Sequence, residues 1–258
     1  MIKEVIYNSN LLKGTGLIQE MLVLIDAYSK GESPNDFQKR VLEEGLLSKS
    51  TDNRTIDVVR NIFKTRFLEK KIDVPEAIRL MREEYVSMDV VIQLFFIYTC
   101  RANPILGDFI RQVYFPAIEK GILNITAEDP KIFIRDAISD ERIPKKWSQS
   151  TIVKVSEHIN ACLIDFGLTE KNKEIRSFRI IDLSANYLAH ELHFSGFSDN
   201  EILYHEDWEL FGLIPNDVAQ ILERISYKGT FLFQYSGQIL KIGWSYNNMK
   251  EFIENECR

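Results

Sequence analysis

The sequence predicts a mainly α-helical protein, with a helical bundle over residues 1–147 and a smaller α+β region over residues 148–258. Three observations support this division. Apolar residues recur at helical spacing through the first part, where no strand pattern appears. A hairpin pattern occurs only near the carboxyl end. Residues 1–147 hold 22 Lys and Arg against 22 Asp and Glu, whereas residues 148–258 hold 10 against 16, so the two parts differ in character.

The first three helices are bounded by glycine and by capping residues. Apolar residues at helical spacing predict a helix from about Leu11 to Tyr28 that stops before Gly31. Ser33 caps a second helix, because Pro34 suits its first position, and Gly45 ends it. A third helix is predicted to begin at residues 50–51 and to continue to about residue 70.

Four more helical stretches precede Trp147. Asp73 with Glu76 three positions later predicts the start of the fourth helix. Residues 88–102 are apolar nearly all round, which is typical of a central helix enclosed by others, and Pro104 follows it. Helices over about 108–120 and 128–139 complete a bundle of about seven.

The second part mixes helices with short strands. Ser148 or Ser150 caps a helix that Gly167 stops, and residues 175–181 resemble a strand. Further helices are predicted over about 185–192 and 215–228. Helix, helix and hairpin is the order of a winged-helix unit, and a small α+β cap packed on the bundle explains that order equally well.

The predicted hairpin pairs residues 230–235 with 238–246. If its turn consists of two residues at positions 236 and 237, Phe233 faces Leu240 and Phe231 faces Ile242. Both strands then present their apolar residues on one face, and that agreement supports the hairpin.

Composition predicts a globular protein of the cytoplasm that does not enter a membrane. The chain has 258 residues, 45% of them hydrophobic and 27% charged. Three cysteines without C-x-x-C spacing fit a reducing compartment, and the first residues lack the pattern of a signal peptide. The most apolar window, residues 90–100, falls short of the ~20 residues that span a bilayer.

The search for catalytic motifs is negative, so we predict a non-enzymatic protein without a cofactor or metal. Residues 13–16, Lys-Gly-Thr-Gly, resemble a phosphate-binding loop, but no strand precedes them and a structural turn is the simpler interpretation. His190 and His193 share a helix face, with His205, Glu206 and Asp207 further on. They are either surface residues or metal ligands. His158, alone on its helix, is predicted to face solvent.

A first basic cluster lies between residues 49 and 82, which hold nine Lys and Arg against five Asp and Glu. Arg60, Lys64 and Lys71 are predicted to form one helical stripe, with Arg54 nearby. Such a stripe can follow a phosphate backbone, or it can simply be a solvated helix face.

A second basic cluster surrounds a predicted helix start. Arg142, Lys145, Lys146 and Lys154 fall within residues 142–156, which contain no acidic residue. Lysines, hydroxyls and free backbone N–H groups at a helix start suit a phosphate, with Trp147 stacking nearby. Alternatively, Trp147 packs as a hydrophobic staple and the lysines are only solvated. The late helix over 215–228 carries acidic residues, which argues against base reading by this helix and leaves it to dock a protein partner.

Several segments together resemble the BrxA family of BREX phage-defence systems over roughly residues 5–170. They are Tyr7 to Leu17, Ser50-Thr51 leading to Arg54 and Arg60, Asp108-Phe109, and Trp147 to Thr151 leading to Leu163 and Gly167-Leu168. The resemblance implies a non-enzymatic helical protein that binds DNA, with a helical region similar to the NusB-type antitermination fold. It also implies partners within the defence system: a DNA adenine methyltransferase, an ATPase and a phosphatase-like protein.

The leading hypothesis is a DNA-binding accessory protein of such a system that grips the duplex backbone and is largely indifferent to sequence. The predicted contacts are Arg54, Arg60, Lys64, Arg142, Lys145, Lys146 and Lys154. The alternatives are a protein-interaction scaffold without nucleic-acid affinity, RNA binding in the manner of NusB and, last, a metal-dependent enzyme.

Overall fold

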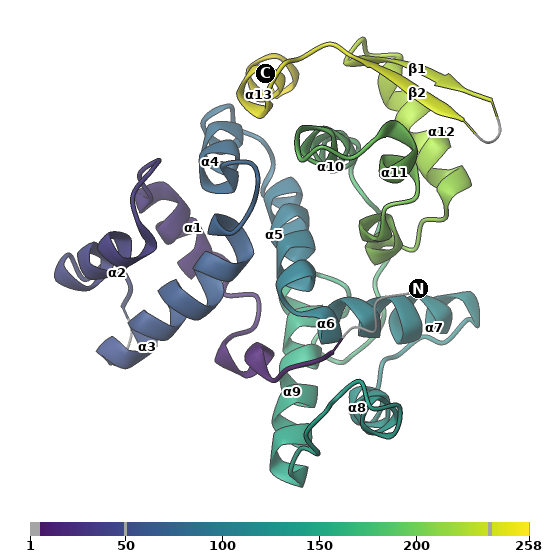
Figure 1. Cartoon of the computed structure of the whole chain (residues 1–258). Coiled ribbons are helices and arrows are strands. Elements are labelled where there is room, and N and C mark those ends of the chain that lie inside the picture. The colour runs from purple at the N-terminus through teal and green to yellow at the C-terminus, as the bar shows by residue number, and fades with distance from the viewer. Residues whose placement is uncertain (1–5, 49–50, 237–238, 258) are drawn as a thin grey trace. The chain divides into compact units, whose positions relative to one another are not determined.

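The computed structural model describes residues 6–48, 51–236 and 239–257, and these are mainly helical with one two-stranded antiparallel sheet (Figure 1). The predicted fold class is therefore confirmed. The internal contacts of the chain define two units, each built from two segments. Unit 1 comprises Met1–Arg66 and Phe95–Phe178, and unit 2 comprises Phe67–Leu94 and Arg179–Arg258. The predicted domain boundary after residue 147 divides the chain differently and stays a prediction.

The regular elements of unit 1 are all helices in the part of it that the structure describes. Its elements are η1 (Asn10–Lys13), α1 (Ile18–Ala27), α2 (Pro34–Glu43), α3 (Asp52–Asp57), most of η2 (Val58–Leu68), the second half of α5 (Met88–Ala102), α6 (Pro104–Phe109), η3 (Ile110–Tyr114), α7 (Phe115–Glu119), α8 (Asp129–Ser139) and α9 (Gln149–Asp165). Within the described part of the chain, no single helix has the length and apolar character to cross a membrane. The Met88–Ala102 and Pro104–Glu119 segments pass that test only as a pair, across a bend of 109°.

The helix starts in unit 1 follow the predicted caps. Ser33 accepts the N–H of Asp36 at 3.2 Å, and Thr51 accepts the N–H of Arg54 at 3.2 Å. The third helix therefore begins after Thr51, while position 50 lies outside the described residues. From Val58 this helix continues as a π-helix, a change of period that apolar spacing does not predict.

Aromatic side chains fill the core of unit 1. Phe37 and Phe63 are fully buried and pack with Tyr28, which meets Phe37 edge-on at 5.2 Å between ring centroids. Tyr114 is also fully buried. Its hydroxyl donates to the carbonyl of Leu168 at 2.8 Å and to the carbonyl of Arg176 at 3.1 Å. Burial raises the pKa of the Tyr114 hydroxyl, so that group stays a neutral donor.

Unit 2 combines helices with the hairpin. Its elements are α4 (Val74–Glu83), the first half of α5, α10 (Asp182–Phe194), α11 (Asp199–Leu203), η4 (Glu206–Phe211), α12 (Pro215–Ser226), β1 (Phe231–Tyr235), β2 (Leu240–Trp244) and α13 (Met249–Glu256). Asp73 caps α4 as predicted, accepting the N–H of Glu76 at 3.1 Å. The sequence did not predict α11, η4 or α13.

The predicted hairpin exists, but its predicted register is wrong by two residues. Phe233 faces Ile242 and Phe231 faces Trp244. The connection is centred one residue later than predicted, because the N–H of Ser236 donates to the carbonyl of Ile239 at 3.1 Å and so continues the register of the strands. Position 237 of the predicted turn lies outside the described residues. A shift of two residues keeps every side chain on its predicted face, so the apolar face survives the error.

The predicted strand over residues 175–181 is also wrong. Only isolated bridges form there, from Glu174 to Asn124 and from Ile175 to Thr169. At the carboxyl end of this segment, in unit 2, the side chain of Gln93 makes the backbone hydrogen bonds that a neighbouring strand would otherwise make. The Gln93 amide donates to the carbonyl of residue 179 at 2.7 Å and accepts the N–H of residue 181 at 3.0 Å.

Candidate nucleic-acid interface

The seven basic residues predicted to contact DNA all lie in unit 1. Three belong to the helical run over residues 52–68, three to the loop before α9, and Lys154 to the second turn of α9. The units also differ in charge, because unit 1 holds 22 Lys and Arg against 20 Asp and Glu, whereas unit 2 holds 10 against 18. The excess of basic over acidic residues is therefore confined to the unit that carries the candidate contacts.

The first cluster is only partly presented to solvent. Arg60 is exposed, and Lys64 is half-buried. Arg54 is half-buried, and its guanidinium donates to the carbonyl of Lys13. Arg54 thus joins α3 to the amino-terminal segment of unit 1 and is held in place by that contact.

The predicted stripe of Arg60, Lys64 and Lys71 does not form. The helical run ends at Leu68, so Lys71 lies beyond it and belongs to unit 2. The Lys71 ammonium donates to the carbonyl of Ser195, the C-cap of α10. A cation at the carboxyl end of a helix stabilises that end, which gives Lys71 a structural role.

The three lysines of the second cluster are all exposed to solvent. Lys145, Lys146 and Lys154 are exposed, and Ser148 is the N-cap of α9, accepting the N–H of Thr151 at 3.2 Å. The Ser148 hydroxyl also lies 2.9 Å from the hydroxyls of residues 150 and 151. Lysines, hydroxyls and the positive end of a 17-residue helix therefore meet at one place.

Arg142, the fourth basic residue of this cluster, makes its contacts within unit 1. Its guanidinium donates to the Tyr7 hydroxyl at 2.9 Å and to Asp140 at 3.2 Å, and lies over the rings of Tyr7 and Phe133. Tyr7 is buried and in turn donates to Asp108 at 2.6 Å. Tyr7 and Asp108 are among the residues that carry the resemblance to the BrxA family. Through Arg142, their contacts attach the amino-terminal segment to the loop before α9.

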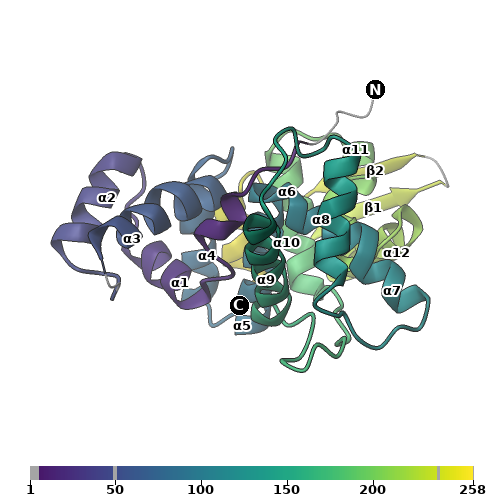
Figure 2. The same ribbon diagram turned by 90° about the horizontal axis from the view of Figure 1, so that it is seen from below.

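The short helix η1 lies between the helical run over 52–68 and α9, and the ribbon views show these elements (Figures 1 and 2). On one side Lys13 forms an ion pair with Asp57 at 2.9 Å. On the other side Nδ1 of His158 lies 2.8 Å from the carbonyl of Leu11, so His158 is half-buried and the prediction that it faces solvent is wrong. The amino-terminal segment thus connects the helical run over 52–68 with α9.

The Lys-Gly-Thr-Gly segment is built differently from a phosphate-binding loop. The guanidinium of Arg66 donates to the carbonyls of Gly16 at 2.9 Å and Thr15 at 2.6 Å, with Gly14 at 3.4 Å. The N–H of Gly16 donates to Asp165 at 2.8 Å rather than pointing outward. A Cβ at Gly16 would lie 2.7 Å from the Cβ of Asp165, so close packing requires glycine there. The structural-turn interpretation therefore fits these contacts.

Histidines of α10 pack among aromatic rings. His190 is fully buried, so the interpretation as a surface residue is wrong for it, and its ring stacks on Phe252 at 4.1 Å. His193 stacks on Trp244 at 4.2 Å. His205 contacts Asp207 at 3.1 Å. No group of three or more His, Cys, Asp or Glu side chains in the described segments converges in a way that would hold a metal ion.

The burial of His190 predicts an acid-sensitive unit 2. Burial lowers the pKa of His190 from 6.5 to about 4, because the apolar surroundings disfavour the imidazolium. Between these two pH values the unfolded chain binds a proton that the folded chain does not, so stability falls as the pH drops from 6.5 to 4. We expect wild type to lose about 3 kcal/mol more than His190→Phe over this range in urea unfolding. Equal losses in the two proteins would contradict this assignment.

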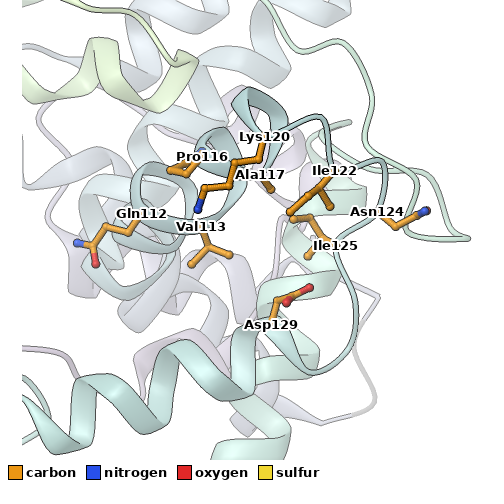
Figure 3. A pocket seen from close by; sticks show the side chains of 9 residues that line it. All are labelled: Gln112, Val113, Pro116, Ala117, Lys120, Ile122, Asn124, Ile125 and Asp129. Carbon is orange, nitrogen blue, oxygen red and sulfur yellow. The ribbon is translucent and has the colours of Figure 1, made fainter.

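A pocket of about 180 Å³ opens in unit 1 where η3 and α7 meet the segment that leads to α8 (Figure 3). Val113, Pro116 and Ile122 form apolar walls, and the Lys120 ammonium and Asp129 carboxylate lie at its edge. Asp129 accepts both the N–H and the hydroxyl of Thr126, at 2.6 and 2.8 Å, which fixes the start of α8. These contacts give the pocket no paired nucleophile and base.

Comparisons with known proteins place the chain in a family and support its fold. The sequence model of the BrxA family matches residues 5–191. A crystal structure of an uncharacterized protein from Magnetospirillum magneticum is similar at a TM-score of 0.59 and 17% identity, covering 73% of this chain and 95% of that one. At this identity the similarity concerns the fold alone. None of the curated proteins compared with the chain matches it.

Proposed function

The chain belongs to the BrxA family, and on that premise we propose that it is a non-enzymatic accessory protein of a BREX phage-defence system that binds duplex DNA through backbone phosphates. The observation that carries the proposal is the group of exposed lysines at the start of α9, Lys145, Lys146 and Lys154. Phosphate contacts give affinity without reading sequence, so binding should be salt-dependent and general.

The arrangement of unit 1 supports a division of labour among its basic residues. Arg60 and the three lysines are exposed and are proposed to contact phosphates directly, together with the half-buried Lys64. Arg54 and Arg142 hold the amino-terminal segment, which connects the helical run over 52–68 with α9. We propose that these two arginines order the surface and reach DNA only with their outer edges.

We propose that unit 2 binds protein partners and does not contact the bases of DNA. The order α10, α11, α12, β1 and β2 is that of a winged-helix-like unit, in which α12 would be the recognition helix. However, α12 exposes Glu223 and places Asp217 in its first turn, and carboxylates there oppose phosphates. The methyltransferase, ATPase and phosphatase-like proteins of the system are the candidate partners.

Competition between nucleic acids tests the class of ligand. We expect a labelled duplex of about 30 base pairs to bind the protein at low salt, and unrelated DNA duplexes to compete equally well. An RNA duplex of the same length should compete less, because A-form geometry changes the spacing of the phosphates. Stronger competition by RNA would favour a NusB-like role, and no binding at low salt would favour the scaffold.

A further inference from the structure

The acidic charge of unit 2 is concentrated in one long stretch. Residues 180–223 contain nine Asp and Glu and no Lys or Arg. Glu201, Glu206, Glu209 and Glu223 within it are exposed, whereas Asp207 is buried. This stretch forms α10, α11, η4 and most of α12, so its negative charge is carried by consecutive elements of unit 2.

An apolar pocket lies within this acidic stretch. It encloses about 140 Å³ between α11, η4 and the start of α12, and is lined by Leu203, Tyr204, Trp208, Leu213, Ile214 and Val218 together with Glu209. Tyr204 and Ile214 are 57% and 61% exposed, so the edge of the pocket presents apolar surface to solvent. A cavity of about 150 Å³ accommodates a benzene ring, so the pocket has room for one leucine- or phenylalanine-sized side chain.

The walls of the pocket are held in place by hydrogen bonds. Trp208 is fully buried and its indole N–H donates to the carbonyl of Ile202 at 2.7 Å. The carboxylate of Asp217 accepts the N–H of Ile214 at 3.2 Å, fixing the start of α12. The pocket is therefore formed before any partner arrives, which lowers the entropy cost of binding.

We propose that this pocket is a docking site for a protein partner, and that it binds a short segment in which one apolar side chain is flanked by Lys or Arg. The apolar side chain fills the pocket and the basic residues lie along the acidic stretch, since complementary charge steers association and fixes register. A second copy that docks through its own acidic stretch is a poor occupant, because the two acidic surfaces would repel each other. This proposal does not depend on DNA binding by unit 1.

Panning a displayed library of random twelve-residue peptides on the full-length protein tests the proposal. We expect enriched peptides to combine a Leu, Ile, Met or Phe with flanking Lys or Arg. Synthetic versions of them should bind at least 10-fold more weakly to Ile214→Lys and to Glu209→Lys than to wild type. The matched controls are Leu232→Lys, which changes an exposed apolar residue on β1, and Glu254→Lys, which changes an exposed acid on α13. Both should bind like wild type.

Three outcomes would overturn the proposal. One is that no peptide is enriched over a blank surface. Another is that the enriched peptides lack basic residues, or bind the Ile214→Lys and control variants equally. The third is a concentration-dependent dimer in sedimentation that Ile214→Lys abolishes, which would assign the pocket to self-association.

Discussion

Replacing Lys145, Lys146 and Lys154 together by Glu is expected to lower the affinity for duplex DNA by about 100-fold at low salt. The estimate follows from about 1 kcal/mol for each exposed phosphate contact, with every 1.4 kcal/mol changing affinity tenfold. All three side chains are exposed, so the substitutions should leave the fold and its far-ultraviolet circular dichroism unchanged. Fluorescence anisotropy with two unrelated duplexes measures the loss, which should be the same for both.

A second triple variant separates contact from overall charge. Lys39, Lys120 and Lys171 are also exposed in unit 1, on α2, after α7 and after α9, away from the start of α9. Their replacement by Glu changes the net charge by the same amount and should weaken binding only several-fold through the long-range field. If both triple variants lose equal affinity, the α9 start is not the binding surface.

The largest expected effect on stability concerns Arg66. Arg66 is 2% exposed, and its guanidinium donates to the carbonyls of the segment 14–16. Burial lowers the pKa of Arg66 to about 10, which still leaves it charged near neutral pH. Arg66→Met retains the length of the side chain but leaves buried carbonyls without a donor, at about 1–3 kcal/mol each. We therefore expect a loss of about 3 kcal/mol or more in urea unfolding.

The control for Arg66 is a neighbour with the same chemistry and a different environment. Arg60→Met removes an exposed guanidinium six positions earlier in the same helical run and should cost less than about 0.5 kcal/mol. Arg66→Lys should be nearly as destabilising as Arg66→Met, because one ammonium does not match the geometry of the guanidinium fork. Similar unfolding energies for the Arg60 and Arg66 variants would contradict the assigned role.

Local rules predicted most of the fold because capping is a local interaction. Ser33 and Asp73 each start a helix as predicted, and of the two predicted caps Ser148 and Ser150 it is Ser148 that starts α9. In each case the cap and its N–H partner are separated by three residues. The register of the hairpin depends on the position of its turn, and the pattern of Phe231 and Phe233 fits two registers that differ by two residues. The short helix α11 escaped prediction although the sequence carries its local signal, because Ser198 and Glu201 form a capping box at its start.

Residue type alone did not distinguish structural from exposed basic groups. Arg54, Arg66 and Arg142 donate to groups that are distant in the sequence, at separations of 41, 50 and 135 residues. Only the fold brings these arginines and their partners together. A count of charges along the sequence therefore treats the three arginines as candidate DNA contacts in the same way as Lys145. A signal that was available and overlooked is the absence of Lys and Arg over residues 180–223.

The salt dependence of DNA binding tests the central proposal most directly. The logarithm of the association constant falls linearly with the logarithm of salt concentration, with a slope of about −0.9 for each phosphate neutralised on B-form DNA. If Lys145, Lys146 and Lys154 each neutralise one phosphate, the triple Glu variant should show a slope shallower than wild type by about 2.7. Parallel lines for the two proteins, or a wild-type affinity that does not change with salt, would contradict backbone binding at the start of α9.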